Sequence, residues 1–377
     1  MEILPLITGI ILSLTGLLYF GLIGLFTYGW YRSKSTLRSR TGSIGIKISV
    51  IIAARNEENS IADLLDDLMV QDYPPALMEV VVVDDHSADG TAAVVKNFLI
   101  SHKLSGYKLL KSEDYHLAGK KEALTLGVTE SAGDLILVTD ADCRLGPGWV
   151  STLAAYFDDK AKVMVFGPVA YIHLEGVINR FQSLEFSGLM ASGAGAAGAG
   201  YPFICNGASL AYRKSAFLQV NGFEGNKRFI SGDDVFLMHK MKKKFGSKAI
   251  GFARDKRLLV QTYPASGLAA FLKQRIRWAS KSKGYGDPLA LATALIVFAY
   301  NFMLSVTFFA GFFSRGFFLL FTGFILLKSM IDLPLMWGVT GFTGSRQLMK
   351  WYLPFQIVYP FYIMVAGILG LFNRKKW

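Results

Sequence analysis

Three of the pairs of acidic residues in this chain of 377 residues could do chemistry. Asp140 and Asp142 are two residues apart in TDADC, and carboxylates at that spacing can hold Mg²⁺ or Mn²⁺ while phosphate oxygens complete the coordination shell. Asp84 and Asp85 are adjacent, and they could accept hydrogen bonds from the base and ribose of a nucleotide. Asp234, beside Asp233, could remove a proton from a hydroxyl group as a general base.

Each pair also has a purely structural interpretation. An Asp-x-Asp triplet taken alone is usually a surface turn. Asp84-Asp85 precedes His86–Gly90, whose residues are typical of a turn that leads into a helix N-cap. Asp233-Asp234 precedes the predicted helix Val235–Phe245, where acidic side chains are favourable because of the helix dipole. The positions of the pairs relative to predicted strands must decide between the two interpretations.

Apolar runs alternate with segments of helical periodicity in the first half of the chain. The runs predict strands and the periodic segments predict helices, which indicates a doubly wound, mostly parallel α/β sheet. Ligands of such sheets bind beyond the carboxyl ends of the strands, which is where Glu57, Asp84-Asp85 and Asp140–Asp142 fall, so we expect one shared site. The predicted strands are Ile46–Ala53, Met78–Val83, Tyr107–Leu110 and Leu135–Val138, and the predicted helices are Asn59–Val70, Gly90–Ile100 and Lys120–Ser131.

The segment Gln274–Trp278 (QRIRW) is the most distinctive motif. At helical spacing Gln274, Arg277 and Trp278 share one face. Trp278 could stack on a sugar, Arg277 could bind pyrophosphate through two hydrogen bonds, and Gln274 could orient a hydroxyl. The alternative, compatible with the first, is an amphipathic helix at a membrane surface. Its apolar side would be Phe271, Leu272, Ile276 and Trp278 in lipid, and its basic side would be Lys273, Arg275, Arg277 and Lys281 in water.

Hydrophobic residues make up 52% of the chain, and they are concentrated at its two ends. Four apolar segments are long enough to cross a bilayer, and we expect three to five spans because Lys328 and Asp332 weaken one of them. Basic residues after the first segment predict that the following domain lies in the cytoplasm, whereas those at the C-terminus disagree with an even number of spans. The segments are Ile3–Trp30, Leu289–Phe313, Gly316–Trp337 and Trp351–Phe372, and the basic residues are Arg32, Lys34, Arg38, Arg40 and Arg374–Lys376.

The formal net charge is +12, which we attribute to contact with anionic lipid headgroups rather than with nucleic acid, because many of the cations flank apolar segments. Cys143 and Cys205 predict no disulfide scaffold, and the five histidines lack the spacing of metal ligands. Gly193–Gly198 (GAGAAG) has the spelling of a dinucleotide-binding loop but no strand before it, so we reject that function. We expect a flexible stretch or close packing against the membrane there.

Seven motifs in a fixed order resemble those of a membrane-bound family 2 glycosyltransferase with the GT-A fold, over roughly residues 46–280. The resemblance implies an inverting enzyme that moves a sugar from a nucleotide diphosphate sugar, expected to be a UDP-sugar, to a lipid-linked or polysaccharide acceptor. It also implies a multi-pass membrane protein whose reaction takes place at the cytoplasmic face. The motifs are Ala53–Glu58, Val82–Thr91, Gly119–Gly127, Thr139–Cys143, Asn206–Phe217, Ser231–Leu237 and Gln274–Trp278.

The same resemblance assigns roles to individual residues. Asp234 would be the catalytic base, Asp140 and Asp142 would hold Mg²⁺ or Mn²⁺, and Asn206-Gly207-Ala208 would help to form the acceptor side. Thr125 departs from the pattern, because many relatives carry Asn there. The nucleotide-sugar residues would be Arg55, Glu57, Asp84, Asp85 and Lys120, and the acceptor or pyrophosphate residues would be Asp233, Gln274, Arg277 and Trp278.

These roles predict four consecutive parts of the chain. They are an anchor at 1–31, a cytoplasmic catalytic domain at 46–260, an interfacial helix with QRIRW at 261–287 and a membrane region at 288–377. Two other classes of function stay open: a nucleotidyltransferase, and a transport or scaffold protein without catalysis. Release of nucleoside diphosphate would indicate glycosyl transfer, release of pyrophosphate would indicate nucleotidyl transfer, and release of neither would favour the scaffold.

Overall fold

The computed structural model describes residues 3–33, 45–173, 175–225 and 232–372. Ser231 of the SGDDVFL motif and the basic residues Lys34, Arg38, Arg40 and Arg374–Lys376 lie outside the described residues. The chain divides into two compact units. The α/β unit consists of Ser33–Ile172 and Ile204–Tyr263, and the helical unit consists of Met1–Arg32, His173–Phe203 and Pro264–Lys376.

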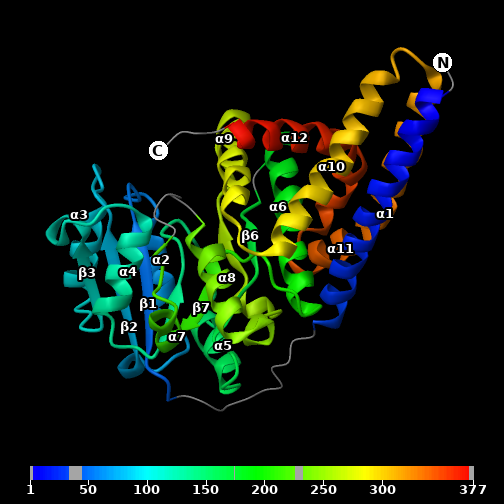
Figure 1. The fold of residues 1–377 in the computed structure, drawn as a ribbon. Helices are drawn as coiled ribbons and strands as arrows, with labels where there is room; N and C mark the ends of the chain where they lie inside the picture. Colours follow the sequence, from blue (N-terminus) through cyan, green and yellow to red (C-terminus); the bar gives the residue numbers. More distant parts are fainter. Residues whose placement is uncertain (1–2, 34–44, 174, 226–231, 373–377) are drawn as a thin grey trace. The chain divides into compact units, whose positions relative to one another are not determined.

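The α/β unit is built on a seven-stranded sheet with the strand order β3-β2-β1-β4-β7-β5-β8 (Figure 1). Strand β7 runs antiparallel to both of its neighbours, and the other pairings are parallel, which confirms the predicted mostly parallel α/β fold. The strands are β1 (Ile48–Ala54), β2 (Met78–Asp84), β3 (Tyr107–Lys111), β4 (Leu135–Val138), β5 (Met164–Phe166), β7 (Leu210–Arg213) and β8 (Ile250–Phe252).

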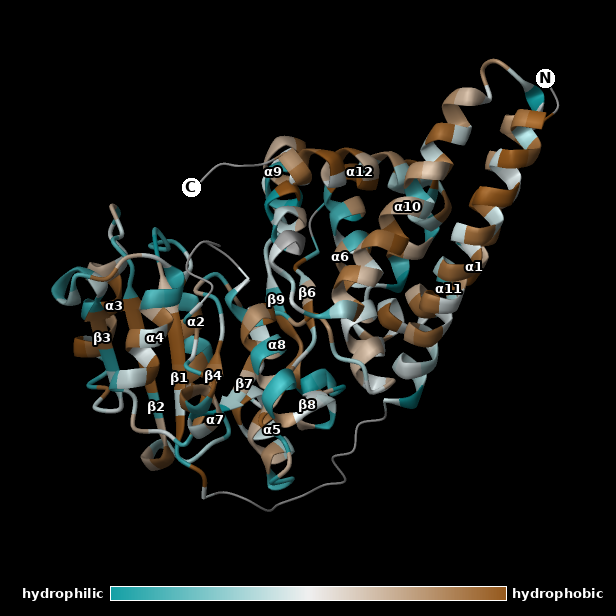
Figure 2. Cartoon of the chain, in the orientation of Figure 1, coloured by the Kyte–Doolittle hydropathy of each residue, from teal (hydrophilic) through white to brown (hydrophobic). Residues whose placement is uncertain are grey.

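The middle of this sheet is apolar because both of its faces are covered. Strand β1 is buried along nearly its whole length, with Val50, Ile51 and Ile52 fully inaccessible, as expected of a central parallel strand. The strand is coloured as hydrophobic in Figure 2. In the register of the sheet Ala54 pairs with Asp84 and Ile51 pairs with Val138. The carboxyl ends of β1, β2 and β4 therefore meet at one edge of the sheet, where the predicted acidic residues follow.

Six α-helices belong to the described part of the α/β unit. In α2 the residues Ile61, Leu64, Leu65 and Leu68 are fully buried, which is the spacing of one helical face. A second sheet of two short parallel strands, β6 (Val169–Tyr171) and β9 (Val260–Thr262), completes this unit. The helices are α2 (Ile61–Met69), α3 (Thr91–Ser101), α4 (Lys120–Glu130), α5 (Trp149–Ala155), α7 (Lys214–Gln219) and α8 (Asp233–Phe245).

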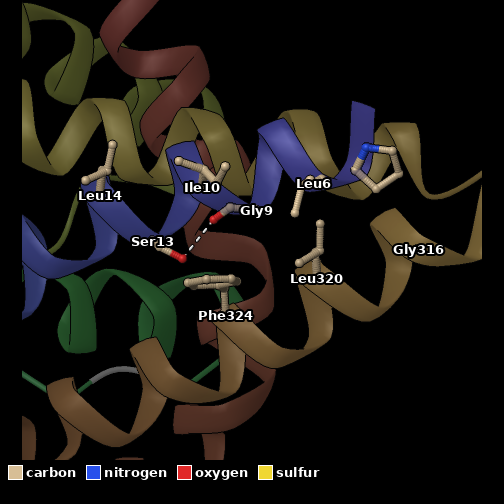
Figure 3. Close-up of a pocket in the computed structure, with 9 residues that line it drawn as sticks. Leu6, Gly9, Ile10, Ser13, Leu14, Gly316, Leu320 and Phe324 are labelled. Carbon is tan, nitrogen blue, oxygen red and sulfur yellow. Dashed lines mark hydrogen bonds between the residues drawn. The ribbon is translucent and has the colours of Figure 1, made fainter. Parts of the chain in front are cut away.

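Four described helices of the helical unit are long and apolar enough to cross a membrane, judged by length and composition (Figure 2). They are α1, α10, α11, and α12 with the short 3-10 helix Arg346–Trp351 before it. Near the start of α1, a small apolar hollow lies between this helix and α11; it is lined by Leu6, Leu320 and Phe324 among others (Figure 3). The helices are α1 (Ile3–Arg32), α6 (Val177–Gly198), α9 (Gly267–Ser280), α10 (Pro288–Ala310), α11 (Arg315–Phe342) and α12 (Tyr352–Phe372).

The glycine-rich segment Gly193–Gly198 forms the last turns of α6, so the expectation of a flexible stretch is wrong. A Cβ on Gly195 would lie 2.1 Å from the carbonyl oxygen of Phe26, and one on Gly29 would lie 1.8 Å from that of Gly195. Small residues are needed because α1 and α6 cross at backbone contact, as in many membrane helix pairs. The predicted continuous domain 46–260 thus differs from the observed units, since α6 packs in the helical unit.

The two charged residues that weakened one predicted span are buried and paired with each other. Lys328 Nζ donates to Asp332 Oδ2 at 2.7 Å and to Gln356 Oε1 at 2.6 Å. The hydroxyl of Tyr19 donates to Asp332 Oδ1 at 2.9 Å. This polar cluster joins α1, α11 and α12, which removes the objection to α11 as a span, because charges inside membrane bundles are accommodated by such pairing.

Candidate active site

Lys120, the first residue of α4, lies at the centre of the acidic residues in the α/β unit. Its Nζ donates to Asp140 Oδ1 at 2.5 Å. Burial lowers the pKa of Lys120, but the negative charges of Asp140, Asp233 and Asp234 outweigh it and raise the pKa far above its ordinary value. The ammonium group therefore stays charged. It also brings together acids that the sequence separates by more than ninety residues.

The first acidic pair lies beside the start of the same helix. The backbone N–H of Gly119, which precedes Lys120, donates to Asp85 Oδ1 at 2.8 Å, and the N–H of Asp85 donates to the Ala54 carbonyl at 2.8 Å. Asp84 and Asp85 are only 5% and 4% exposed. Within the described part of the chain, Asp84 Oδ1 is buried without a hydrogen-bond donor. A buried carboxylate oxygen without a donor is unfavourable, so a ligand that supplies an N–H or O–H would stabilise it.

The Asp-x-Asp acids follow β4 and lie close to Glu57, which follows β1. Burial raises the pKa of Asp142, Asp140 raises it further, and a hydrogen bond at 3.1 Å from the hydroxyl of Thr262 opposes the shift. Burial also raises the pKa of Glu57, a hydrogen bond from Ser60 lowers it, and the charges of Asp142 and Asp140 raise it further. Asp140 and Asp142 thus disfavour the charge on Glu57, and Asp140 disfavours the charge on Asp142, in a space that is partly withdrawn from water.

This arrangement fits a divalent cation shared with a bound diphosphate. Among the described residues no group of three or more His, Cys, Asp or Glu side chains is arranged to hold a metal ion by itself. Mg²⁺ is usually bound by one or two carboxylates together with substrate phosphates and water. The carboxylates of Asp140 and Asp142 are such a set, and a cation there would offset the burial, and the charge of Asp140, that raise the pKa of Asp142.

The third acidic pair begins helix α8, directly after Gly232. Asp234 Oδ2 accepts the backbone N–H of Gly207 at 2.9 Å, and its Oδ1 accepts that of Val235 at 2.8 Å. The neighbouring Asp233 is 7% exposed. The contact with Gly207 places the Asn206-Gly207-Ala208 segment against the acid pair, two motifs that the sequence analysis assigned to the acceptor side.

Other predicted residues lie as follows. Arg55 is exposed in the loop after β1, and its role stays a prediction. Thr125 donates to the Lys121 carbonyl inside α4 at 2.8 Å. Sequence reasoning missed Thr262, which holds Asp142 from the three-residue strand β9, because so short a strand leaves no periodic signal.

The QRIRW segment forms the second half of α9 in the helical unit. Arg275 is 3% exposed, and its Nε donates to Glu185 Oε2 of α6 at 3.0 Å. Its guanidinium carbon lies 4.2 Å from the ring centre of Trp278 and 4.8 Å from that of Phe271, which is 1% exposed. The amphipathic interpretation that put Arg275 in water and Phe271 in lipid is therefore wrong, because both are buried in protein. Gln274, Arg277 and Trp278 are half-buried, and their roles stay predictions.

Comparison with known proteins supports the same family over most of the chain. Residues 49–220 match the family described as glycosyl transferase family 2, and residues 135–369 match glycosyl transferase family group 2. The probable glycosyltransferase YdaM of Bacillus subtilis is 39% identical over 97 residues, which are 26% of this chain and 23% of that protein. An N-acetylglucosaminyltransferase of Mesorhizobium japonicum is 26% identical over 243 residues, which are 62% of this chain and 55% of the relative. The chain thus spans about half or less of the length of these curated relatives.

A solved structure shares the fold over nearly the whole chain. The mannosyltransferase PcManGT from Pyrobaculum calidifontis, solved with GDP-Man and Mn²⁺, has a TM-score of 0.65 and covers 98% of this chain and 100% of its own, at 18% identity. The likeness shows a common fold. Since the second family match alone covers more than half of the sequence, the chain belongs to the family 2 glycosyltransferases.

Proposed function

We propose that this chain is an inverting membrane glycosyltransferase. It would transfer a sugar from a nucleotide diphosphate sugar to a lipid-linked or polysaccharide acceptor at the cytoplasmic face of the membrane. The observation that carries the proposal is the convergence on Lys120, whose pKa is raised by acids from both the Asp140 and the Asp233-Asp234 motifs. A protein without catalysis has no need for such crowding of carboxylates around one cation.

The donor nucleotide would bind at the carboxyl ends of β1 and β2. Asp84 Oδ1, which is buried without a donor in the described structure, would accept a hydrogen bond from the base or the ribose. Asp85 is held by the Gly119 N–H and would form the same wall, while Arg55 and Glu57 would form the other. Lys120 would sit beside the pyrophosphate. We expect a UDP-sugar, and the GDP-Man bound to PcManGT makes a guanine nucleotide the donor to test beside it.

Asp140 and Asp142 would hold Mg²⁺ or Mn²⁺ against the diphosphate. When bound, the cation would neutralise charge that develops on the departing nucleoside diphosphate. The protein's own part is to orient both carboxylates. Thr262 donates to Asp142 Oδ2, and Lys120 donates to Asp140 Oδ1.

Asp234 would take the proton from the acceptor hydroxyl. The acceptor oxygen then forms a bond to the anomeric carbon from the side opposite the diphosphate, whose bond to that carbon breaks, so the configuration inverts. Backbone N–H groups hold both oxygens of Asp234, and each carboxylate oxygen has a further lone pair for the hydroxyl. The base is therefore oriented before the substrate arrives.

The four long apolar helices favour a membrane location and an acceptor that resides in the bilayer. A single transfer to a lipid and repeated transfer to a growing polysaccharide are both compatible with this arrangement.

One experiment separates glycosyl transfer from nucleotidyl transfer and from a scaffold without catalysis. Membranes that contain the chain are incubated with a panel of UDP- and GDP-sugars, with and without a chelator, and the released nucleotide and the lipid extract are analysed by mass spectrometry. We expect nucleoside diphosphate and a glycosylated product, both of which require divalent metal. Release of pyrophosphate would show a nucleotidyltransferase instead, and the absence of any turnover would support the scaffold.

A further inference from the structure

We propose that Arg275, held by Glu185, is a positioning residue that fixes Gln274 and Trp278 of the QRIRW segment for sugar transfer. The inference rests on the proposed function, because it assigns how one part of that enzyme is kept in order.

Arg275 contacts both the first and the last residue of the motif. Its Nη1 donates to Gln274 Oε1, and its guanidinium lies over the ring of Trp278 at 4.2 Å. The same guanidinium lies 4.8 Å from the centre of the Phe271 ring, so Arg275 interacts with two aromatic rings of its own helix. Gln274 and Trp278 are four residues apart and share one helical face. One side chain thus restrains the two groups that would orient a hydroxyl and stack on a sugar.

Arg275 is itself held from two other helices. Glu185 of α6 accepts Nε at 3.0 Å and also Nη2, and the hydroxyl of Tyr362 of α12 donates to the other Glu185 oxygen at 3.0 Å. The side chains of Arg275 and Glu185 are only 2% and 9% exposed. The ring of Tyr362 stacks on that of Phe271 at 5.3 Å. We call Arg275, Glu185 and Tyr362 the motif clamp.

Stability alone does not account for such a cluster. Apolar residues of similar volume often stabilise a core as well as a buried ion pair does, because removing two charges from water is unfavourable. What the clamp adds is orientation, since a planar guanidinium with paired donors has a defined direction that lysine lacks. A group fixed before the substrate binds loses no rotational freedom during the reaction.

A second buried ion pair in the helical unit provides a control. Lys328 contacts Asp332, Gln356, Tyr19 and Tyr359, all outside residues 274–278. Tyr352, which is also on α12, is the control for Tyr362, because it too has a buried hydroxyl that donates a hydrogen bond, here to the Ser329 carbonyl at 2.6 Å. Glu185 and Tyr362 can therefore each be compared with a similar change outside the motif and the clamp, Asp332→Asn and Tyr352→Phe.

The first test measures kinetics on the full chain in detergent or lipid. We expect Arg275→Lys to lower kcat about tenfold or more, because loss of orientation reduces the rate of the oriented step while donor binding stays near that of the parent. Tyr362→Phe should lower kcat by a smaller factor, and Tyr352→Phe should keep the parent kcat. Equal effects of the two tyrosine changes, or a parent-like kcat in Arg275→Lys, would overturn the clamp.

The second test needs no turnover. Melting temperatures are measured for Glu185→Gln, Trp278→Phe and the double variant. Because Arg275 contacts both Glu185 and Trp278, the double shift should be smaller than the sum of the single shifts, as for residues in one network. Asp332→Asn combined with Trp278→Phe should be additive. Where Glu185→Gln does not fold, Tyr362→Phe replaces it.

The two tests separate failure of the clamp from failure of the proposed function. Additive melting shifts for Glu185 and Trp278 would overturn the clamp whatever the activity. Coupled shifts in a parent that turns over no sugar donor would overturn the proposed function and, with it, the role of the clamp in transfer, while the contact itself would stand. Coupled shifts with reduced kcat in Arg275→Lys would support both.

Discussion

Substitution of Asp234 by asparagine tests the assignment of the catalytic base most directly. Asparagine keeps the size of the side chain and one oxygen that can accept the Gly207 N–H, now at 2.9 Å from Asp234 Oδ2. It loses the negative charge, and it has an amide nitrogen in place of the oxygen that accepts the Val235 N–H at 2.8 Å. The change therefore removes the base while leaving most of the local packing.

The two consequences differ enough in size to be separated. Loss of one backbone hydrogen bond should reduce the free energy of unfolding by about 0.5–1.5 kcal/mol. Loss of a charge in the first turn of α8 should add about 0.3–1 kcal/mol. Loss of a general base lowers kcat by about 10²–10⁴-fold. The folded protein should thus survive, since domains are stable by about 5–15 kcal/mol, while the chemical step is nearly lost.

The assay measures initial rates of product formation at saturating donor and, separately, the Kd of the nucleoside diphosphate. Asp255→Asn is the matched control in the same unit. Asp255 Oδ1 accepts the Arg257 N–H at 3.0 Å at the start of the short helix Lys256–Leu258, and its Oδ2 accepts Arg257 Nη2 at 2.8 Å, so this variant also loses a charge and a helix cap. We expect the control to turn over like the parent and Asp234→Asn to bind nucleotide without transferring sugar. Turnover of Asp234→Asn within a few-fold of the parent would refute the reasoning.

Three further predictions concern the metal, the sheet and the helical unit. Asp142→Ala should abolish the metal-dependent part of donor binding; calorimetry that shows the same affinity with and without chelator in the parent and the variant would exclude the metal role. Glu79→Gln should reduce the free energy of unfolding by about 1–3 kcal/mol at pH 7. Burial raises the pKa of Glu79, but hydrogen bonds from the Ser49 hydroxyl and the Ala132 N–H and the charge of Lys108 lower it below the ordinary value. The charge of Glu79 therefore stabilises the fold fully at a pH above the ordinary pKa of a glutamate, and this stabilisation is lost as the pH falls through the lower pKa of Glu79 in the folded protein. The melting temperatures of variant and parent should thus converge in acid. A constant difference would contradict the ion pair. Gly195→Ala should destabilise the helical unit by about 1–3 kcal/mol through overpacking against Phe26, whereas Gly24→Ala, which faces open space on α1, should not, and equal melting temperatures for the two would contradict the helix crossing.

The strands and helices around the first two acidic pairs could be predicted from the sequence because their patterns are local. Leu135–Val138 was predicted to the residue, and β1, β2 and α4 within one or two residues at each end. Short buried runs that end in polar residues specify a parallel strand and its carboxyl end together. The mostly parallel α/β fold and the acids at one sheet edge follow from this, whereas the GT-A type was implied only by the resemblance to a known family.

The second half of the α/β unit gave weaker signals. Strands β5, β8 and β9 have three residues each, so they carry too little periodicity to be recognised. The contact of Thr262 with Asp142 joins residues 120 positions apart, and no local pattern reports it.

The sequence by itself determined the fold class, the acidic motifs and the apolar helices, because each depends on residue type and spacing within one element. Only the tertiary structure decided which charges meet. The sequence pattern places Arg275 on the water-facing side of an amphipathic helix, but in the structure it pairs with Glu185, which lies ninety residues earlier in the chain. Lys120 acquires its raised pKa from acids on other elements. The neighbouring residues in the sequence indicate which motif a charged residue belongs to. Its pKa and its partners depend on groups that folding brings close to it.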